Sequence, residues 1–328
     1  MGTRGRFGLT GQVETGEGKR RLPHLVARLR TSFYLGRLAQ GDRLPSVRGL
    51  ARQLGISPTT VLNLYRQLED EGFVEGKPRS GTFLRTLGLE AKRPRRHAAL
   101  FEQLTETARW LELRNASPLE FTRLLLRVTG VTRRDDYRFG FLSHRESFEM
   151  LSPSIVRRLR FDPLVLLSPD PRNEEEVRAH LARDRSIRCI LSTYLYSTLA
   201  FRLAREFDRH MIVIQIRPES ARILEPPAQG SRAIITRDPD CADAFRTLLD
   251  AVDGAGAGRF YVADVGDAEA MAVIERDAAE IFASGPGFEA ATAWLGGRRP
   301  VTVIPSGVAE RTIDDMLYHY VFADERAT

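Results

Sequence analysis

The sequence predicts an α+β module of three helices and a hairpin, followed by an α/β region of two lobes with mostly parallel sheets. Residues 22–72 contain three successive apolar stripes at helical spacing, and two short extended segments follow them. From Tyr137 onward, short apolar runs alternate with helical patterns, which is the order of parallel βαβ units. The two parts also differ in the sign of their net charge.

The charge of this 328-residue chain is divided unevenly along its length. Residues 1–96 hold 19 Lys and Arg against 8 Asp and Glu, a net charge of +11, whereas residues 97–328 hold 30 against 35, a net charge of −5. A basic end module favours a polyanionic partner such as nucleic acid, although a solvated basic tail has the same composition.

Composition also excludes several classes of protein. No apolar run approaches the ~18 residues that a membrane helix needs, and the first residues lack the apolar core of a secretory signal. Cys189 and Cys241 form no CxxC pattern, so neither a disulfide framework nor a zinc site is indicated. We therefore expect a cytoplasmic protein without a metal site or a membrane partner.

Each helix of the first module has a recognisable beginning or end. The first helix has its apolar face within residues 22–33. The second helix follows Ser46, which is suited to cap it, and Gly55 is placed to end it. The Ser57-Pro58 pair, a cap followed by proline at the first helical position, predicts a third helix that ends near Gly72.

A hairpin completes this module. Residues 73–75 and 81–84 have the composition of two short strands, and the Gly- and Ser-containing segment between them forms the tip. Three helices and a hairpin in this order define a winged helix-turn-helix, which we place at residues 22–90. Residues 1–21 show no periodicity and are expected to form a disordered basic tail.

The exposed face of the third helix suits contact with bases. In a helix-turn-helix, the second helix of the pair enters the major groove. At 100° per residue, Thr59, Asn63 and Arg66 lie opposite the apolar stripe. Asn can pair with adenine, Arg with guanine, and Thr can bind phosphate or a thymine methyl group. Ser57 and Thr60 lie at the helix N-terminus, which favours phosphate, although a solvated polar face has the same pattern.

The stretch from Gly41 to Phe83 resembles the DNA-binding domain of the GntR family of bacterial transcription regulators. The resemblance covers about residues 22–85 and includes the Leu44-Pro45-Ser46 entry followed by Arg48, and the Gly-Thr-Phe wing. It implies that Arg48 holds phosphate or a base, that the start of the third helix anchors the DNA, and that the wing approaches the minor groove. The candidate DNA-binding residues are Arg48, Ser57, Thr59, Thr60, Asn63, Arg66, Arg79, Gly81 and Thr82.

One residue departs from the family pattern. Many members of the family have Arg or Asn directly after the residue that matches Ser57, where this chain has Pro58. A side chain that would reach the DNA is therefore missing. For this reason, the DNA sequence bound by other members cannot be carried over to this chain.

The rest of the chain divides into a connector and an α/β domain. Residues 91–136 begin with a basic linker and continue with helical stripes, so we assign them to a linker and dimerisation segment. Residues 137–328 form the expected effector-binding domain, with a crossover between its lobes at 225–232. The expected strands are 138–142, 163–167, 187–192, 211–216, 232–236, 259–263, 279–283 and 300–304. The expected helices are 146–159, 173–183, 195–209, 240–252, 267–277 and 288–295.

The distribution of lysine narrows the chemistry of the second half. The GntR family includes a branch with an aminotransferase-like domain that binds pyridoxal phosphate through a lysine. Lys19, Lys77 and Lys92 are the only lysines of the chain, so the second half cannot form that Schiff base. A P-loop lysine is equally absent, and neither G-x-S-x-G nor HExxH occurs. We therefore expect no cofactor, no catalytic residue and no enzyme.

The alternation of strands and helices across two lobes resembles the ligand domain of periplasmic-binding-like regulators. Open α/β sheets bind ligands at the carboxyl ends of their strands, and small hydroxyls, an aromatic ring and arginines there suit a polar, anionic ligand. Ser and Thr at these positions also commonly cap the next helix. The candidate effector residues are Ser143, Arg145, Ser192, Thr193, Tyr194, Arg217 and Ser284.

The sequence therefore predicts a DNA-binding transcription regulator of GntR type, with a winged helix-turn-helix domain followed by a two-lobed α/β ligand domain. We expect a homodimer on a palindromic double-stranded DNA operator, controlled by a small-molecule effector. Two alternatives remain open. The α/β domain could be an enzyme tethered to a DNA-binding module, or the chain could be a ligand-free architectural DNA-binding protein.

Overall fold

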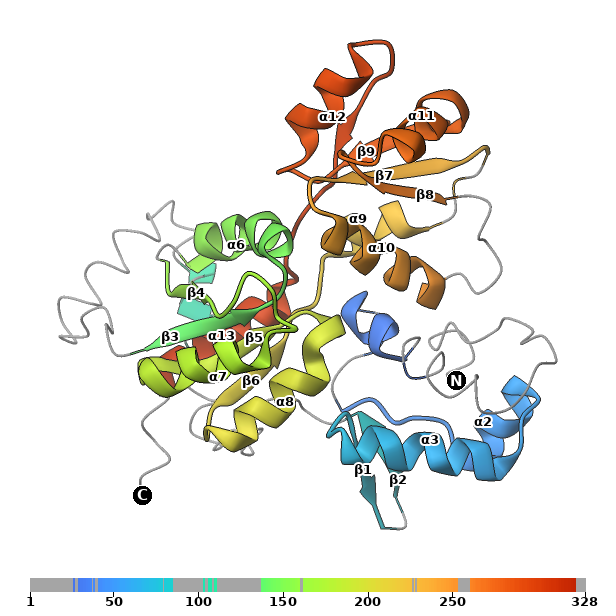
Figure 1. Ribbon diagram of the computed structural model, residues 1–328. Helices are drawn as coiled ribbons and strands as arrows, with labels where there is room; N and C mark the ends of the chain where they lie inside the picture. The colour runs from blue at the N-terminus through green and yellow to red at the C-terminus, as the bar shows by residue number, and fades with distance from the viewer. Residues whose placement is uncertain are drawn as a thin grey trace.

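The computed structural model describes residues 26, 29–36, 38, 41–78, 80–84, isolated positions between 103 and 110, and then 137–159, 162–225, 227, 229–252 and 260–322. The expected tail at 1–21, almost all of the expected linker at 91–136 and the candidate Arg79 lie outside the described residues. The described chain forms an N-terminal domain and two α/β lobes (Figure 1).

The N-terminal domain has the predicted helices and hairpin. Helix α2 (Val47–Leu54) is capped by the hydroxyl of Ser46 and ends at Gly55, whose φ of 63° is left-handed. Helix α3 (Pro58–Asp70) begins after Ser57, whose side chain accepts a hydrogen bond from the Thr60 N–H. Strands β1 (Val74–Lys77) and β2 (Gly81–Leu84) pair in an antiparallel hairpin. The domain therefore has the winged helix-turn-helix order, with residues 29–34 as part of its first helix.

The apolar stripes predicted from the sequence form the core of this domain. The α3 residues Val61, Leu64 and Leu68 are fully buried, and they belong to one cluster with Leu50 of α2 and Phe73 before the hairpin. Burial of each such side chain stabilises the fold by about 1.5–3 kcal/mol. The polar side of α3 consequently faces solvent.

Lobe one, the first α/β lobe, is a parallel four-stranded sheet in the order β4-β3-β5-β6. Its strands are β3 (Arg138–Leu142), β4 (Leu164–Leu166), β5 (Ile187–Ser192) and β6 (His210–Val213). Its helices are α6 (Arg145–Leu159), α7 (Glu174–Arg183), the 3-10 turn η1 (Tyr194–Tyr196) and α8 (Ser197–Glu206).

Lobe two has the same arrangement. Its parallel sheet has the order β10-β9-β7-β8, so in both lobes the first strand lies between the second and the third, with the fourth outside the third. Its strands are β7 (Arg232–Thr236), β8 (Phe260–Asp264), β9 (Glu280–Ala283) and β10 (Thr302–Val303). Its helices are α10 (Pro239–Val252), α11 (Ala268–Asp277) and α12 (Phe288–Leu295). The predicted two-lobed parallel α/β architecture is confirmed.

Two crossovers join the lobes. The first, residues 214–231, contains the short helix α9 (Pro218–Ala221) and the turn η2 (Arg222–Leu224). The second, residues 304–309, leads from β10 to α13 (Glu310–Phe322), a helix that returns to lobe one and contacts β6 and α6. Figure 1 shows this red C-terminal helix behind the green and yellow elements of lobe one. An antiparallel bridge between Ile216 and Val308 holds the two crossovers side by side.

The structure corrects the predicted end of one strand. The sequence predicts a strand at 211–216 and a crossover at 225–232, but β6 ends at Val213. The reason is that the following backbone has other partners, since the Gln215 N–H bonds to the Thr312 hydroxyl and the Ile216 N–H bonds to the Tyr34 carbonyl. The apolar run therefore continues as the crossover rather than as sheet.

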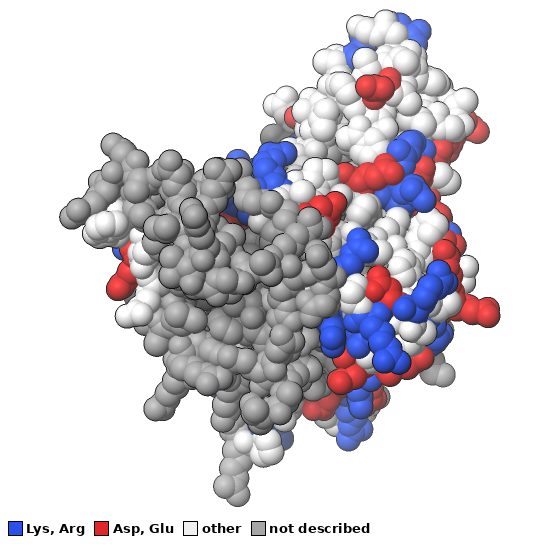
Figure 2. All heavy atoms as spheres, turned by 90° about the vertical axis from the view of Figure 1, so that its left-hand side faces the viewer, with Lys and Arg blue, Asp and Glu red and all other residues white. Residues whose placement is uncertain are grey.

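The surface of the lobes carries both signs of charge. On the face in Figure 2, Lys and Arg side chains are interspersed with Asp and Glu over the described part of the surface, with lobe two at the top. This mixture agrees with the mildly acidic balance of residues 97–328.

Candidate nucleic-acid interface and effector site

Helix α3 presents its candidate base-contacting residues to solvent. Thr59, Asn63 and Arg66 are all exposed, opposite the buried apolar stripe. Asn63 and Arg66 form no ion pair or side-chain hydrogen bond within the described residues. Their donors and acceptors are therefore available to a partner that approaches this face.

The hydroxyls at the start of α3 have a structural role. The Ser57 Oγ accepts a hydrogen bond of 3.1 Å from the Thr60 N–H and lies 2.8 Å from the Thr60 hydroxyl. Ser57 is exposed and Thr60 is half-buried. These two residues therefore fix the first turn of the helix, and the exposed Ser57 hydroxyl lies where a phosphate group is favoured by the helix N-terminus.

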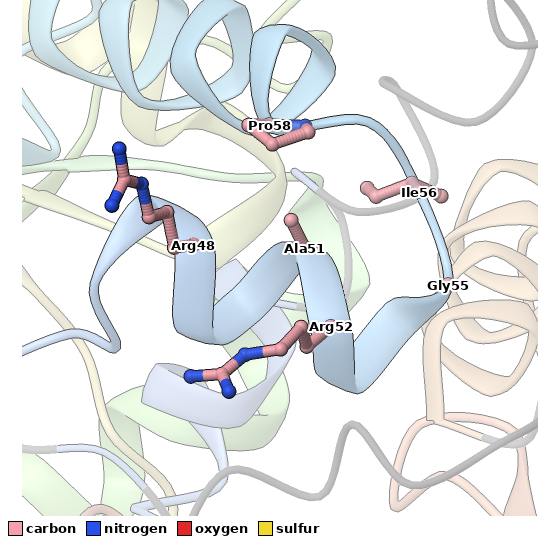
Figure 3. A pocket seen from close by; sticks show the side chains of 6 residues that line it. All are labelled: Arg48, Ala51, Arg52, Gly55, Ile56 and Pro58. Carbon is pink, nitrogen blue, oxygen red and sulfur yellow. The ribbon is translucent and has the colours of Figure 1, made fainter.

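A hollow of about 610 Å³ lies between α2 and the start of α3. Figure 3 shows Ala51 pointing toward Pro58, while the guanidinium groups of Arg48 and Arg52 extend back toward the beginning of α2. Both arginines are exposed and form no ion pair within the part of the chain that the structure describes. Guanidinium groups bind phosphate in a bidentate manner, so these two arginines are available to an anionic group beside the hollow. Arg52 was not among the predicted site residues.

The wing is held close to the loop before α2. Gly81 has a φ of 112°, and a Cβ atom there would lie 3.1 Å from the Nε of Arg43. The Leu44 N–H donates to the Thr82 carbonyl at 2.8 Å. Gly81 is exposed and Thr82 is half-buried. Arg43 is a further exposed cation at the wing that the sequence analysis did not select.

The comparisons with known proteins agree on this domain. The model of the family described as bacterial regulatory proteins, gntR family, matches residues 23–84. The HTH-type transcriptional regulator Rv1152 of Mycobacterium tuberculosis is 40% identical over 73 residues, which are 22% of this chain and 60% of that protein. The uncharacterised HTH-type transcriptional regulator YdeL of Bacillus subtilis is 52% identical over 52 residues, 16% of this chain and 11% of that protein.

Residues 23–84 are therefore a GntR-family helix-turn-helix domain. A GntR family transcriptional regulator from Listeria monocytogenes is 22% identical and covers 37% of this chain, with a TM-score of 0.20. The chain spans from about a tenth to 60% of the length of the first curated relatives that it matches. The first two of these relatives are described as HTH-type transcriptional regulators.

Five of the candidate effector residues lie at or directly after the carboxyl ends of strands: Ser143 follows β3, Ser192, Thr193 and Tyr194 are at the end of β5, and Ser284 follows β9. Ser143, Ser192 and Ser284 are fully buried, and Thr193 and Tyr194 are nearly so. The Ser143 and Ser192 hydroxyls donate to the carbonyls of the next residues at 3.0 Å and 2.8 Å. These hydroxyls are thus already satisfied within the protein.

The two candidate arginines occupy different surroundings. Arg145 is exposed at the start of α6. Arg217 lies in the first crossover, donates from Nε to the Val308 carbonyl at 3.3 Å and pairs with Glu310 at 3.5 Å. Arg217 therefore links the two crossovers and forms no hydrogen bond with the other candidate effector residues among the described residues.

The strand ends of the two lobes meet around Glu146. This residue was not among the candidate residues predicted from the sequence. This carboxylate extends from α6 of lobe one and is fully buried. Its two oxygens accept hydrogen bonds from the backbone N–H groups of Arg237 and Asp238, at 2.8 Å and 2.7 Å, and from the Ser284 hydroxyl. All three donors belong to lobe two, so one buried charge is solvated across the seam between the lobes.

Weaker contacts surround this carboxylate. The Nη2 of Arg172, in lobe one, donates to both carboxylate oxygens of Asp240, in lobe two, at 2.9 Å and 3.0 Å. Arg237 pairs with Glu149 at 2.9 Å, and the partner carboxylates Asp238 and Glu149 raise the pKa of its guanidinium. The two lobes are therefore in polar contact across the strand ends where an effector is expected.

A buried histidine lies at the same edge of lobe one. The His144 Nε2 contacts the Tyr196 hydroxyl, and its Nδ1 is buried without a hydrogen-bond partner. Burial lowers the pKa of His144. The neutral form of the imidazole is therefore favoured, because burial disfavours the charged form and the Tyr196 hydroxyl is a neutral partner.

The N-terminal domain contacts the crossovers directly. The Gln215 side-chain amide donates to the carbonyls of Phe33 and Leu38, at 3.1 Å and 3.3 Å. The Ile216 N–H donates to the Tyr34 carbonyl at 3.1 Å, and the Tyr34 and Tyr194 rings lie 5.0 Å apart. The first helix of the DNA-binding domain thus contacts the first crossover between the lobes and, through Tyr34, the candidate effector residue Tyr194.

Other classes of site were sought in the same residues. Within the described ranges, no group of three or more His, Cys, Asp or Glu side chains is arranged to hold a metal ion. Among these residues there is also no helix with the length and apolar character needed to cross a membrane.

Glu146 provides the first prediction. Glutamine keeps one oxygen acceptor but puts its amide NH₂ against at least one of the three donors, so we expect Glu146→Gln to lower the free energy of unfolding by about 2–4 kcal/mol. Glu149→Gln removes only a half-exposed ion pair and should cost less than about 1 kcal/mol. Urea unfolding of the full chain, followed by circular dichroism, measures both. Equal losses in the two variants would contradict the role given to Glu146.

Proposed function

We propose that this chain is a DNA-binding transcription regulator that binds a palindromic operator as a homodimer and responds to a small anionic effector in its α/β domain. The observation that carries this proposal is the exposed face of α3, where Thr59, Asn63 and Arg66 face solvent within a GntR-family domain. The proposal places the protein in the cytoplasm, because its partner is DNA.

The basic surroundings of α3 support DNA as the partner. Residues 1–96 carry a net charge of +11, and Arg48 and Arg52 line the hollow beside the helix. Phosphate contacts position a protein on DNA, whereas side chains in the groove specify the sequence. We assign Arg48, Ser57, Thr60, Arg79 and the wing residues Gly81 and Thr82 to positioning.

A homodimer on a palindrome follows from the geometry of duplex DNA. Two recognition helices about 34 Å apart would contact half-sites one helical turn apart. Selection of DNA in vitro by the full-length protein tests this proposal directly, because the spacing of the enriched half-sites reports the arrangement of the two domains.

The two-lobed domain suits an effector-binding role of the periplasmic-binding-like kind. A ligand between the lobes would have to displace the contacts of Glu146, and the donors that hold this carboxylate are those that an acidic ligand would need. Lobe movement would be transmitted through Gln215 and Ile216 to the first helix of the DNA-binding domain. An effector with different affinities for the two lobe arrangements would then change DNA binding.

Arg66→Ala and Asn63→Ala provide a test of base recognition. Each should reduce discrimination between the selected operator and random DNA by about 1–3 kcal/mol, because each removes a pair of hydrogen bonds to a base edge. Fluorescence anisotropy titrations with both DNAs at one salt concentration measure this difference. If both DNAs lose the same affinity, these residues do not specify the sequence.

Arg48→Ala tests the phosphate assignment. Removing one phosphate contact should weaken binding to operator and random DNA alike and reduce the slope of log K against log salt by about 1. Arg183→Ala, which removes an exposed arginine at the end of α7 in lobe one, serves as the matched control and should leave the slope unchanged. A wild-type slope in Arg48→Ala would place Arg48 away from the DNA backbone.

A thermal-shift screen of the full chain against small carboxylic acids, sugars and amino acids tests the effector. We expect an acid to raise the melting temperature without being consumed and to change operator affinity, since a ligand stabilises the form that it binds. Turnover of the hit would instead favour an enzyme. No stabilising compound in a broad panel would favour a ligand-free architectural protein.

A further inference from the structure

The recognition helix carries an exposed leucine that the hydrophobic core does not use. Leu62 of α3 is 39% exposed, and the other large exposed hydrophobic residues in the described part of the chain are Trp110 and Val303. Leu62 lies directly before Asn63, which is also exposed. Leu62 flanks the polar face, and an exposed apolar side chain there is unfavourable in water and gains free energy when a partner covers it.

The position of Leu62 along the helix defines a row of side chains. Residues four apart lie on one side of an α-helix, so Pro58, Leu62 and Arg66 follow one another along α3. All three are exposed. The row therefore begins with two apolar side chains and ends with a cation, and it adjoins Asn63 on the same outward side.

We propose that Leu62 is a specificity-determining residue that contacts the 5-methyl group of a thymine in each half-site. This inference rests on the proposed DNA-binding function. In the major groove the thymine methyl is the apolar group on the base edges, and apolar side chains recognise it by contact. The neighbouring Arg66 and Asn63 would hydrogen-bond to adjacent base pairs.

The positive charge around Pro58, Leu62 and Arg66 favours DNA, rather than a second copy of this chain, as the partner that covers Leu62. Pro58 lines the same hollow as Arg48 and Arg52, and neither arginine has an ion-pair partner in the described residues. Two copies meeting through this face would bring these cations together. A phosphate backbone would neutralise them while the groove floor covers Leu62.

The test uses the full-length protein and the operator that it selects. Each thymine of one half-site is replaced in turn by deoxyuridine, which lacks the 5-methyl group, and the dissociation constants are measured by fluorescence anisotropy. We expect one position to lose about fourfold in affinity, the value for one buried methyl group, and about 15-fold when both half-sites are changed. The other positions should lose less.

Leu62→Ala completes the comparison. On the thymine operator this variant should bind as weakly as the wild type binds the uracil operator, and its own response to the replacement should be less than about twofold, because the contact is already absent. Val303→Ala, which shortens an exposed apolar residue in lobe two, is the matched control and should respond like the wild type.

Two results would overturn the proposal. If Leu62→Ala keeps the full wild-type response to uracil, another residue contacts the methyl group. If no thymine is selected beside the bases that depend on Arg66 and Asn63, Leu62 has another partner. Failure to select any DNA would instead overturn the proposed function as well, so the two failures are distinguishable.

Discussion

The solvation of one buried charge determines how the two α/β lobes meet. The Glu146 carboxylate leaves water on folding, a cost of several kcal/mol that only close and complete hydrogen bonding can offset. Its donors are two backbone N–H groups and a hydroxyl, all from lobe two. Lobe one therefore supplies the charge and lobe two supplies the solvation, so neither lobe can move away without exposing unmatched polar groups. The ion pairs of Arg172 and Glu149 at the rim are exposed and add little by comparison.

The first crossover between the lobes also forms hydrogen bonds to a separate part of the chain, the DNA-binding domain. The Gln215 side chain and the Ile216 N–H bond to the carbonyls of Phe33 and Tyr34, in the first helix of the DNA-binding domain, and of Leu38, which follows it. Phe33 and Tyr34 lie at the helix end, where four backbone acceptors need partners from outside the helix. The DNA-binding domain thus completes its own hydrogen bonding through the effector domain. The covalent connection through residues 85–136 is therefore accompanied by a direct contact.

The sequence predicted those features whose determinants are local. The caps at Ser46 and Ser57 and the left-handed Gly55 are read from one or two residues each, and the apolar stripe of α3 has a helical period. The strands of both lobes are continuous apolar runs, which parallel sheets require. The exposed face of α3 follows from the same period.

The features that the sequence did not predict depend on distant partners. Glu146 has no unusual neighbours in the sequence, and its role comes from residues 237, 238 and 284. The end of β6 depends on Tyr34 and Thr312, and α13 mixes apolar and polar residues without a clear beginning.

The repeated strand order has an electrostatic consequence. Because both lobes place their first strand in the same position, α6 and α10 are equivalent helices, and each begins at the carboxyl end of its lobe's first strand. The start of α6 carries Glu146, and this carboxylate binds the backbone just before α10. The N-terminal ends of two helices therefore lie close to this carboxylate, and the partial positive charge of each favours an anion there. Glu146 is that anion. Negative charge at this place, from a side chain or from a bound acid, therefore favours closure of the repeat.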